Sequence, residues 1–129
     1  MIKNYRDLIV WQKATGGSVC LYQMTRTFPR EEIYGLTSQM RRAAVSIASN
    51  IAEGQGRASR LEFRKFLLIA RGSLFELETQ ITIAEKLGYI NQSQYDDITS
   101  RYKEVGRILN SLVMKLAQQP QPVPQKSDH

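Results

Sequence analysis

The sequence of 129 residues is poor in the residue types that bind metals or act as nucleophiles. It has one cysteine, Cys20, and one histidine, His129, which is its last residue. A single cysteine excludes an internal disulfide bond. Because no histidine precedes residue 129, the Glu-x-x-His motifs of di-iron bundles are absent and a Cys–His catalytic pair is not expected. We therefore expect no metal site and no cofactor.

Long apolar segments are also missing. The longest uninterrupted apolar runs span only a few residues, whereas a transmembrane helix needs about 20. The first residues, Met1 to Asp7, lack the apolar core and the cleavage site of a signal peptide. No membrane partner is expected, and we predict that the protein stays in the cytoplasm.

Motifs typical of enzymes are weak or incomplete. Gly54-Gln55-Gly56 lacks the third glycine and the Lys-Ser/Thr ending of a phosphate-binding loop. The carboxylate pairs Glu31-Glu32 and Asp96-Asp97 lie at a proline turn and in the first turn of a helix, where negative charge complements the helix dipole. Since no nucleophile–base pair can be assembled, we expect no catalytic residues and no enzymatic activity.

What the chain does have is four long segments with apolar residues at spacings of three and four, the periodicity of amphipathic helices. Hydrophobic residues make up 42% and charged residues 23%, as in a globular domain. The links between the segments are short, which favours antiparallel neighbours. We predict an all-α, up-down-up-down antiparallel four-helix bundle over residues 1–118, with helices at about 7–27, 36–53, 60–87 and 92–118.

Local signals mark several helix ends. Asp7 is the expected N-cap of the first helix. Ser59 and Glu62 match a capping box at the start of the third helix, and Gly88 is its expected C′ residue. Gly16-Gly17 predicts a close contact, a bend or a break in the first helix. Residues 119–129, rich in Pro and Gln, are predicted to form a flexible tail.

Apolar residues define the predicted core and leave a second set outside it. The core residues of the last three helices are Leu36, Met40, Ala44, Ile47, Ile51, Phe63, Phe66, Ala70, Leu74, Leu77, Ile81, Ala84, Tyr95, Ile98, Tyr102, Val105, Leu109, Leu112 and Leu116. The first helix runs through Leu8, Trp11, Val19 and Tyr22, and core packing is the expected role of Trp11, Tyr22, Tyr34 and Tyr102. Leu61, Leu68 and Phe75 lie seven residues apart outside the core, which indicates a surface for self-association.

Positive charge is concentrated in one stretch of the chain. The sequence has 18 Lys and Arg against 12 Asp and Glu, a net charge of +6. Residues 41–71 hold seven of the basic side chains and two acids, so most of the excess lies there. Arginine suits phosphate because its planar fork binds two oxygens at once. The predicted nucleic-acid-binding residues are Arg41, Arg42, Arg57, Arg60, Arg64, Lys65 and Arg71.

Other interpretations of these basic residues stay open at this point. They could form a solvated surface, or they could pair with Glu53, Glu62, Glu76 and Glu78 within the bundle or between subunits. Arg60, Arg64 and Arg71 lie within about 40° of one another on a helical wheel. Arg41 and Arg42 lie near them if the second and third helices pack antiparallel.

Several motifs together resemble a known family. They are Asp7-Leu8-x-Val10-Trp11-Gln12-Lys13-Ala14, Thr25-x-x-Phe28-Pro29-x-Glu31-Glu32-x-Tyr34-Gly35-Leu36-Thr37-Ser38-Gln39, Arg41-Arg42-Ala43-Ala44-Val45-Ser46-Ile47, Asn50-Ile51-Ala52-Glu53-Gly54-x-Gly56-Arg57 and Ala70-Arg71-Gly72-Ser73-Leu74-x-Glu76-Leu77-Glu78-Thr79-Gln80. The chain thereby resembles the four-helix-bundle proteins encoded in intervening sequences of 23S ribosomal RNA genes. That family is similar in fold to the accessory variability proteins of diversity-generating retroelements, which form barrel-like homopentamers that bind nucleic acid and a reverse transcriptase.

The resemblance implies a ring-shaped homo-oligomer, with a pentamer expected, and a basic surface that serves RNA or DNA. Our first hypothesis is a non-catalytic, oligomeric accessory protein that binds nucleic acid through the basic face. The alternative is a protein scaffold that recruits a partner, such as a reverse transcriptase or a ribosomal component, without binding nucleic acid itself.

Overall fold

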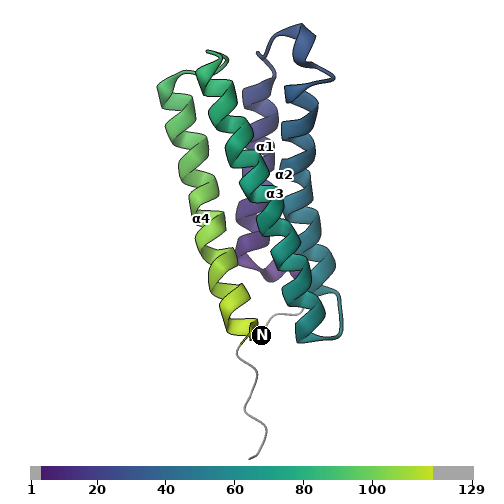
Figure 1. The fold of residues 1–129 in the computed structure, drawn as a ribbon. Coiled ribbons are helices and arrows are strands. Elements are labelled where there is room, and N and C mark those ends of the chain that lie inside the picture. The colour runs from purple at the N-terminus through teal and green to yellow at the C-terminus, as the bar shows by residue number, and fades with distance from the viewer. Residues whose placement is uncertain (1–3, 118–129) are drawn as a thin grey trace, which may run out of the picture.

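A computed structural model describes residues 4–117, and every regular element within this range is helical. Four long helices form the body of the molecule: α1 (Ile9–Thr25), α2 (Leu36–Gln55), α3 (Arg60–Lys86) and α4 (Gln92–Ala117) (Figure 1). Two short 3₁₀ turns, η1 (Tyr5–Asp7) and η2 (Arg30–Glu32), precede α1 and α2. The predicted all-α fold is confirmed.

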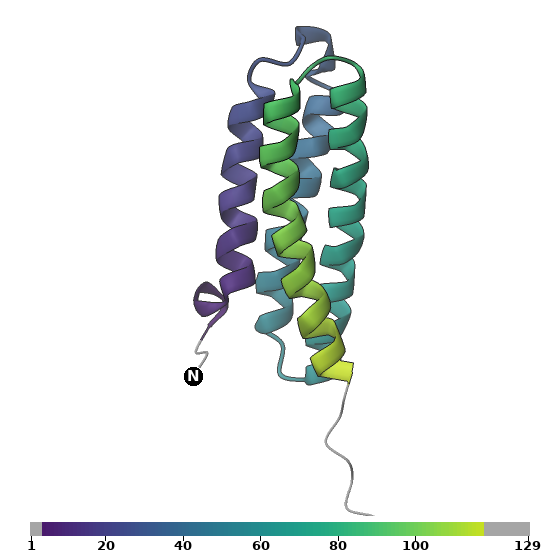
Figure 2. The ribbon, with the colours of Figure 1, turned by 90° about the vertical axis from the view of Figure 1, so that its left-hand side faces the viewer.

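The four helices alternate in direction and pack as an antiparallel bundle. Each of α1 and α3 packs against both α2 and α4, so α1 and α3 lie diagonally opposite each other. Figure 2, turned by 90° from Figure 1, shows the same up-down-up-down order from another side. The α1–α2 groove and the α3–α4 groove are therefore on opposite sides of the bundle.

The first helix is shorter than the sequence predicted, and its predicted N-cap is wrong. Asp7 accepts the amide of Asn4 at 3.3 Å, while the Asn4 side chain accepts the amide of Arg6 at 2.8 Å. Because this reciprocal capping closes η1, Asp7 is already engaged there, and α1 begins at Ile9 with Leu8 as its N-cap. Pro29 pushes the residue before it out of the α region, and α1 ends at Thr25.

The predicted N-cap Ser59 and C′ residue Gly88 of α3 are confirmed, whereas only half of the predicted capping box is present in the described chain. Ser59 Oγ accepts the amide of Glu62 at 2.9 Å, which is one of the two bonds of a capping box. Gly88 has a φ of +80°, and the amide of Tyr89 donates to the carbonyl of Ala84 at 2.9 Å. This pattern is a Schellman motif, in which a residue in the left-handed region closes the helix.

Most of the predicted core positions of α2, α3 and α4 are buried, and Ala43, Leu67 and Val113 are added members. The predicted residues at the edge of the core are Leu36, Phe63, Tyr95, Leu112 and Leu116. The core role predicted for Phe66 is wrong, because this side chain is not part of the buried cluster. The face of α1 differs from the prediction, because Val19 and Tyr22 are exposed. The buried residues of α1 are Val10, Ala14, Gly17, Leu21 and Thr25. Several of these are small, so the pattern of large apolar residues pointed to the wrong face.

The glycine pair marks a close contact, and α1 runs through it without a break. A Cβ atom built on Gly17 would lie 2.9 Å from Cζ of Tyr102, whose side chain is fully buried in α4. A Cβ atom on Gly16 would meet nothing within 4 Å. The predicted core role of Tyr102 is confirmed, whereas Tyr34 is 96% exposed and does not pack in the core.

Two predictions concern residues outside the part of the chain that the structure describes. The tail at 119–129, and residue 118 at the end of the predicted fourth helix, fall outside residues 4–117. Within the described part of the chain, no helix combines the length and the apolar character that crossing a membrane requires.

Candidate nucleic-acid interface

The seven basic residues predicted to bind nucleic acid divide into two groups in the structure. Arg41 and Arg42 lie in the first half of α2. Arg57 lies in the connection between α2 and α3, and the remaining four lie in the first half of α3. Because α2 and α3 run in opposite directions, the first half of α2 and the first half of α3 are at opposite ends of the bundle.

Two arginines of α3 bind the backbone of α4 across the α3–α4 groove. Arg60 Nη2 donates to the carbonyl of Lys115 at 3.1 Å, and Arg64 Nε donates to the carbonyl of Val113 at 3.1 Å. These carbonyls belong to the last residues of α4 that the structure describes, where the negative end of the helix dipole lies. Both arginines therefore also stabilise the C-terminal end of α4.

Arg71 extends the same row of arginines toward the middle of the groove. Its Nη1 donates to Oδ1 of Asn110 at 3.0 Å, and its guanidinium lies 5.9 Å from the centre of the Phe75 ring. Arg60, Arg64 and Arg71 thus share one face of α3, as the helical wheel predicts, and all three reach from this face to α4. The structure brings these three residues together along one groove.

Arg57 and Lys65, the other two basic residues near the start of α3, do not bind α4 within the described chain. Arg57 pairs with Glu53 at 2.8 Å and lies 4.9 Å from the centre of the Phe66 ring. Pairing of a predicted phosphate-binding arginine with Glu53 within the bundle is one of the alternatives that the sequence left open. Lys65 is exposed and contacts no hydrogen-bonding or ionic partner within residues 4–117.

Arg41 and Arg42 belong to the other side and the other end of the bundle. Arg41 Nε donates to Thr25 Oγ1 at 2.9 Å, and its Nη2 donates to the carbonyl of Tyr22 at 3.2 Å, both at the end of α1. Arg42 lines a hollow beside Arg41 and Tyr22. The expectation that these two residues lie near Arg60, Arg64 and Arg71 is wrong, because α2 turns Arg41 toward the α1–α2 side.

Charge in the α3–α4 hairpin is separated along the bundle axis. We call residues 60–75 and 105–117 the basic half, and residues 76–104 the acidic half. The basic half has six basic side chains and one acid, Glu62, so its net charge is +5. The acidic half has six acids and three basic side chains, a net charge of −3.

The fourth helix, α4, contributes to this arrangement in a way that the sequence alone did not predict. Arg107 and Lys115 are exposed residues of the basic half, and no Asp or Glu occurs between residues 105 and 117. That acid-free stretch was visible in the sequence. Its significance depends on knowing that the end of α4 lies against the start of α3, which the structure establishes.

Exposed apolar side chains accompany the basic half. Leu61 is 67% exposed and Phe75 is 54% exposed, as expected for the second apolar set, while Leu68 is half-buried against the core. The contact between Arg71 and Phe75 shows that the apolar and basic side chains adjoin. This surface therefore combines positive charge with apolar area.

A separate polar contact ties the connection before α2 to the connection after α3. Glu32 Oε1 accepts the amide of Leu36 at 3.0 Å, and its Oε2 accepts the hydroxyl of Tyr89 at 2.8 Å. The bond from the Leu36 amide, and then that from Tyr89, lowers the pKa of Glu32 below its usual value. The bond to Glu32 in turn raises the pKa of Tyr89.

Within residues 4–117 no three His, Cys, Asp or Glu side chains gather as metal ligands would.

Comparison with known proteins gives a family for this chain. The family model described as the 23S rRNA-intervening sequence protein matches residues 6–111. The chain belongs to this family. The family is also the one that the sequence motifs resemble, so that resemblance is confirmed.

A solved structure supports the fold. The chain is similar to a crystal structure from Bacteroides thetaiotaomicron, described as a protein with unknown function from the S23 ribosomal protein family. The two share 25% sequence identity with a TM-score of 0.74, and the match covers 81% of this chain and 98% of that one. No curated protein matches the chain.

Proposed function

We propose that this family member is a non-catalytic, oligomeric accessory protein that binds RNA or DNA through the basic half of its α3–α4 hairpin. The observation that carries the proposal is the separation of charge in that hairpin, +5 in one half and −3 in the other. A polyanion is attracted to the first and repelled by the second. The proposal therefore includes a location for the phosphates.

The arginines of the groove suit phosphate contacts even though they also bind α4. A guanidinium carries five N–H donors, and Arg64 and Arg71 each use one of them in the bonds to Val113 and Asn110. These bonds hold both side chains in place, so less conformational entropy is lost when a phosphate binds. The groove is thus a row of partly preorganised donors.

The names of related proteins point in the same direction. The family is named after an intervening sequence of 23S ribosomal RNA, and the solved relative is assigned to a ribosomal protein family. The first name refers to a ribosomal RNA and the second to ribosomal proteins. They support a nucleic-acid partner for this chain without identifying which one.

Self-association is part of the proposal. Leu61 and Phe75 expose more apolar surface than a single bundle needs, and a second copy of the chain would cover it. In a ring, the basic half would be repeated around the assembly. Repetition raises the affinity of a weak site for a long polyanion through avidity.

Reversal of two charges in the basic half is expected to weaken RNA binding strongly. In the double variant Arg71→Glu/Arg107→Glu, neither lost side chain caps the end of α4. Since a hydrogen bond to a charged group contributes about 1.5 kcal/mol or more, losing two such contacts should raise the Kd about 100-fold. Fluorescence anisotropy with a structured RNA measures this change.

The matched control reverses two charges in the acidic half. Lys86→Glu/Arg101→Glu makes the same change in net charge at exposed positions, and its Kd should stay within about threefold of the original at physiological salt because screening acts over about 8 Å. Equal losses of affinity in both variants would contradict the assigned surface. Circular dichroism verifies that both variants keep their helices.

The alternative function is a scaffold that recruits a protein partner, and the apolar residues beside the basic half favour it. Leu61 and Phe75 could then meet an apolar surface of the partner while the arginines meet its acids. Affinity purification with and without nuclease treatment separates the two functions. A partner held through nucleic acid is lost on treatment, and a partner held by direct contact remains.

A further inference from the structure

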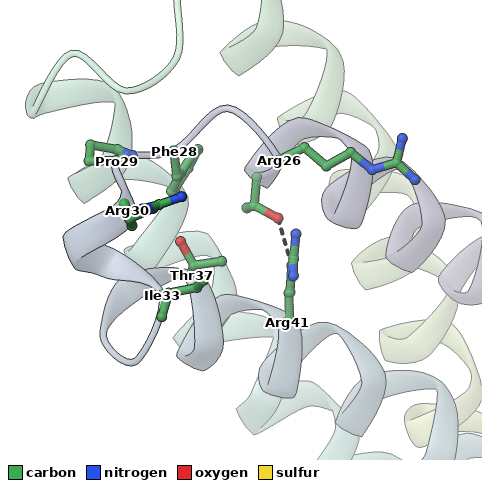
Figure 3. A pocket seen from close by; sticks show the side chains of 8 residues that line it. Arg26, Phe28, Pro29, Arg30, Ile33, Thr37 and Arg41 are labelled. Carbon is green, nitrogen blue, oxygen red and sulfur yellow. Dashed lines mark hydrogen bonds between the residues drawn. The ribbon is translucent and has the colours of Figure 1, made fainter.

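A second basic site lies at the other end of the bundle, where the connection between α1 and α2 crosses the helix ends. This cavity has a volume of about 300 Å³ and lies between the end of α1, η2 and the start of α2. Figure 3 shows the side chains that line it. Its apolar wall includes Phe28 and Ile33. Three arginines line it, and none of its lining residues within the described chain is acidic.

Two of these arginines are placed to contact a ligand. Arg41 is held by its bonds from Nε to Thr25 and from Nη2 to Tyr22, and no acceptor in residues 4–117 takes its Nη1. Arg30 is exposed on η2 and forms no ion pair with any described residue. Arg26 lines the rim, but Figure 3 shows its side chain extending away from the cavity.

Thr37 supplies a polar group that is otherwise unexplained. Its side chain is only 4% exposed, lines the cavity, and forms no hydrogen bond with any residue of the described chain. In Figure 3 its hydroxyl points toward Arg30 and Phe28, across the cavity. Because this hydroxyl faces the cavity and has no partner in the described chain, a ligand in the cavity can form a hydrogen bond with it.

The start of α2 adds further donors and a favourable dipole. Thr37 and Ser38 belong to the first turn of this 20-residue helix, and their amides have no acceptor within residues 4–117. Free amides and the helix dipole together favour an anion. Glu32 already places a carboxylate at this helix end, where its Oε1 accepts the amide of Leu36 and its Oε2 accepts the hydroxyl of Tyr89, so the amides of Thr37 and Ser38 are the helix donors left for a ligand.

We propose that this cavity binds a phosphate monoester, with Arg30, Arg41 and the Thr37 hydroxyl as its principal donors. A monoester carries a charge of about −1.5 to −2 at pH 7, which the charges of Arg30 and Arg41 balance. The apolar wall at Phe28 and Ile33 accommodates the group that carries the phosphate. A free nucleotide and the 5′-phosphate end of an RNA strand share this chemistry.

Isothermal titration calorimetry with adenosine 5′-monophosphate tests the site. Saturable binding to the unmodified protein is expected, with a Kd raised about tenfold in Arg30→Gln and about fivefold in Thr37→Val. Both variants should keep the fold, since Arg30 is exposed and Thr37→Val removes only an unpaired hydroxyl. Arg101→Gln, which removes one positive charge from α4, is the control and should leave the Kd unchanged.

Two RNA probes identify the source of the phosphate. If short single-stranded RNA binds more tightly with a 5′-phosphate than with a 5′-hydroxyl, and Arg30→Gln removes the difference, the site holds a strand end. If the two RNAs bind equally while the mononucleotide binds, the site holds a free nucleotide. Either outcome supports the site.

Two results would overturn it: no saturable binding of the mononucleotide, or a Kd that is the same in the unmodified protein and in both variants. The result of the mononucleotide titration does not depend on the α3–α4 surface. The mononucleotide should bind equally well to Arg71→Glu/Arg107→Glu, so failure of one proposal is distinguishable from failure of the other.

Discussion

Replacing Gly54 by alanine is expected to destabilise the folded protein by about 2 kcal/mol. A Cβ atom at this position would lie 2.6 Å from Cβ of Phe66 and 3.2 Å from the carbonyl oxygen of Phe63. Neither atom can be moved by a change of rotamer, because both are fixed by the course of α3. The two helices would have to separate where they pack most closely, and this cost exceeds the roughly 1 kcal/mol that alanine gains over glycine within a helix.

Gly72 provides the matched control in α3. A Cβ atom there would meet nothing within 4 Å, so Gly72→Ala should stabilise the protein by about 0.5–1 kcal/mol. Urea denaturation of both variants, monitored by circular dichroism, gives the two free energies of unfolding. A Gly54→Ala protein at least as stable as the original would show that α2 and α3 are not packed as described.

Replacing Leu74 by alanine should cost about 3 kcal/mol, within the usual range for a buried leucine. Leu74 is 2% exposed at the centre of the bundle. It packs so closely on α4 that a Cβ atom at Gly106 would lie 3.0 Å from its Cδ2 atom. Two helices that are fixed by their other contacts cannot close the cavity that the mutation leaves.

Leu61→Ala removes the same atoms from the same helix at an exposed position. Because Leu61 is 67% exposed, its replacement should change the free energy of unfolding by less than about 0.5 kcal/mol. Denaturation at low protein concentration measures both variants without a contribution from self-association. A cost at Leu61 equal to that at Leu74 would contradict the assignment of the apolar residues to core and surface.

Most of the fold could be predicted because the apolar spacing of α2, α3 and α4 is strong and their ends carry local signals. Ser59 and Gly88 act through bonds to residues a few positions away, which a sequence shows directly. The buried face of α1 could not be predicted in this way. Its close contact depends on Gly17, and a glycine contributes nothing to an apolar pattern; only the position of Tyr102 in the bundle explains it.

The candidate nucleic-acid interface could be predicted only in part. The row of Arg60, Arg64 and Arg71 follows from helical spacing alone. The bonds of Arg60 and Arg64 to the end of α4 join residues about 50 positions apart, so they depend on tertiary structure. For the same reason, the separation of charge in the hairpin emerges only when the end of α4 is placed beside the start of α3.

The measurement that tests the central proposal most directly is the salt dependence of nucleic-acid binding. Fluorescence anisotropy of the unmodified protein with a structured RNA and a matched DNA duplex gives the affinity at a series of salt concentrations. With up to six basic side chains on phosphates, log K for the duplex should fall against log salt with a slope of about −5. An absence of binding at low salt, or an affinity that does not change with salt, would contradict a phosphate-binding role for the basic half.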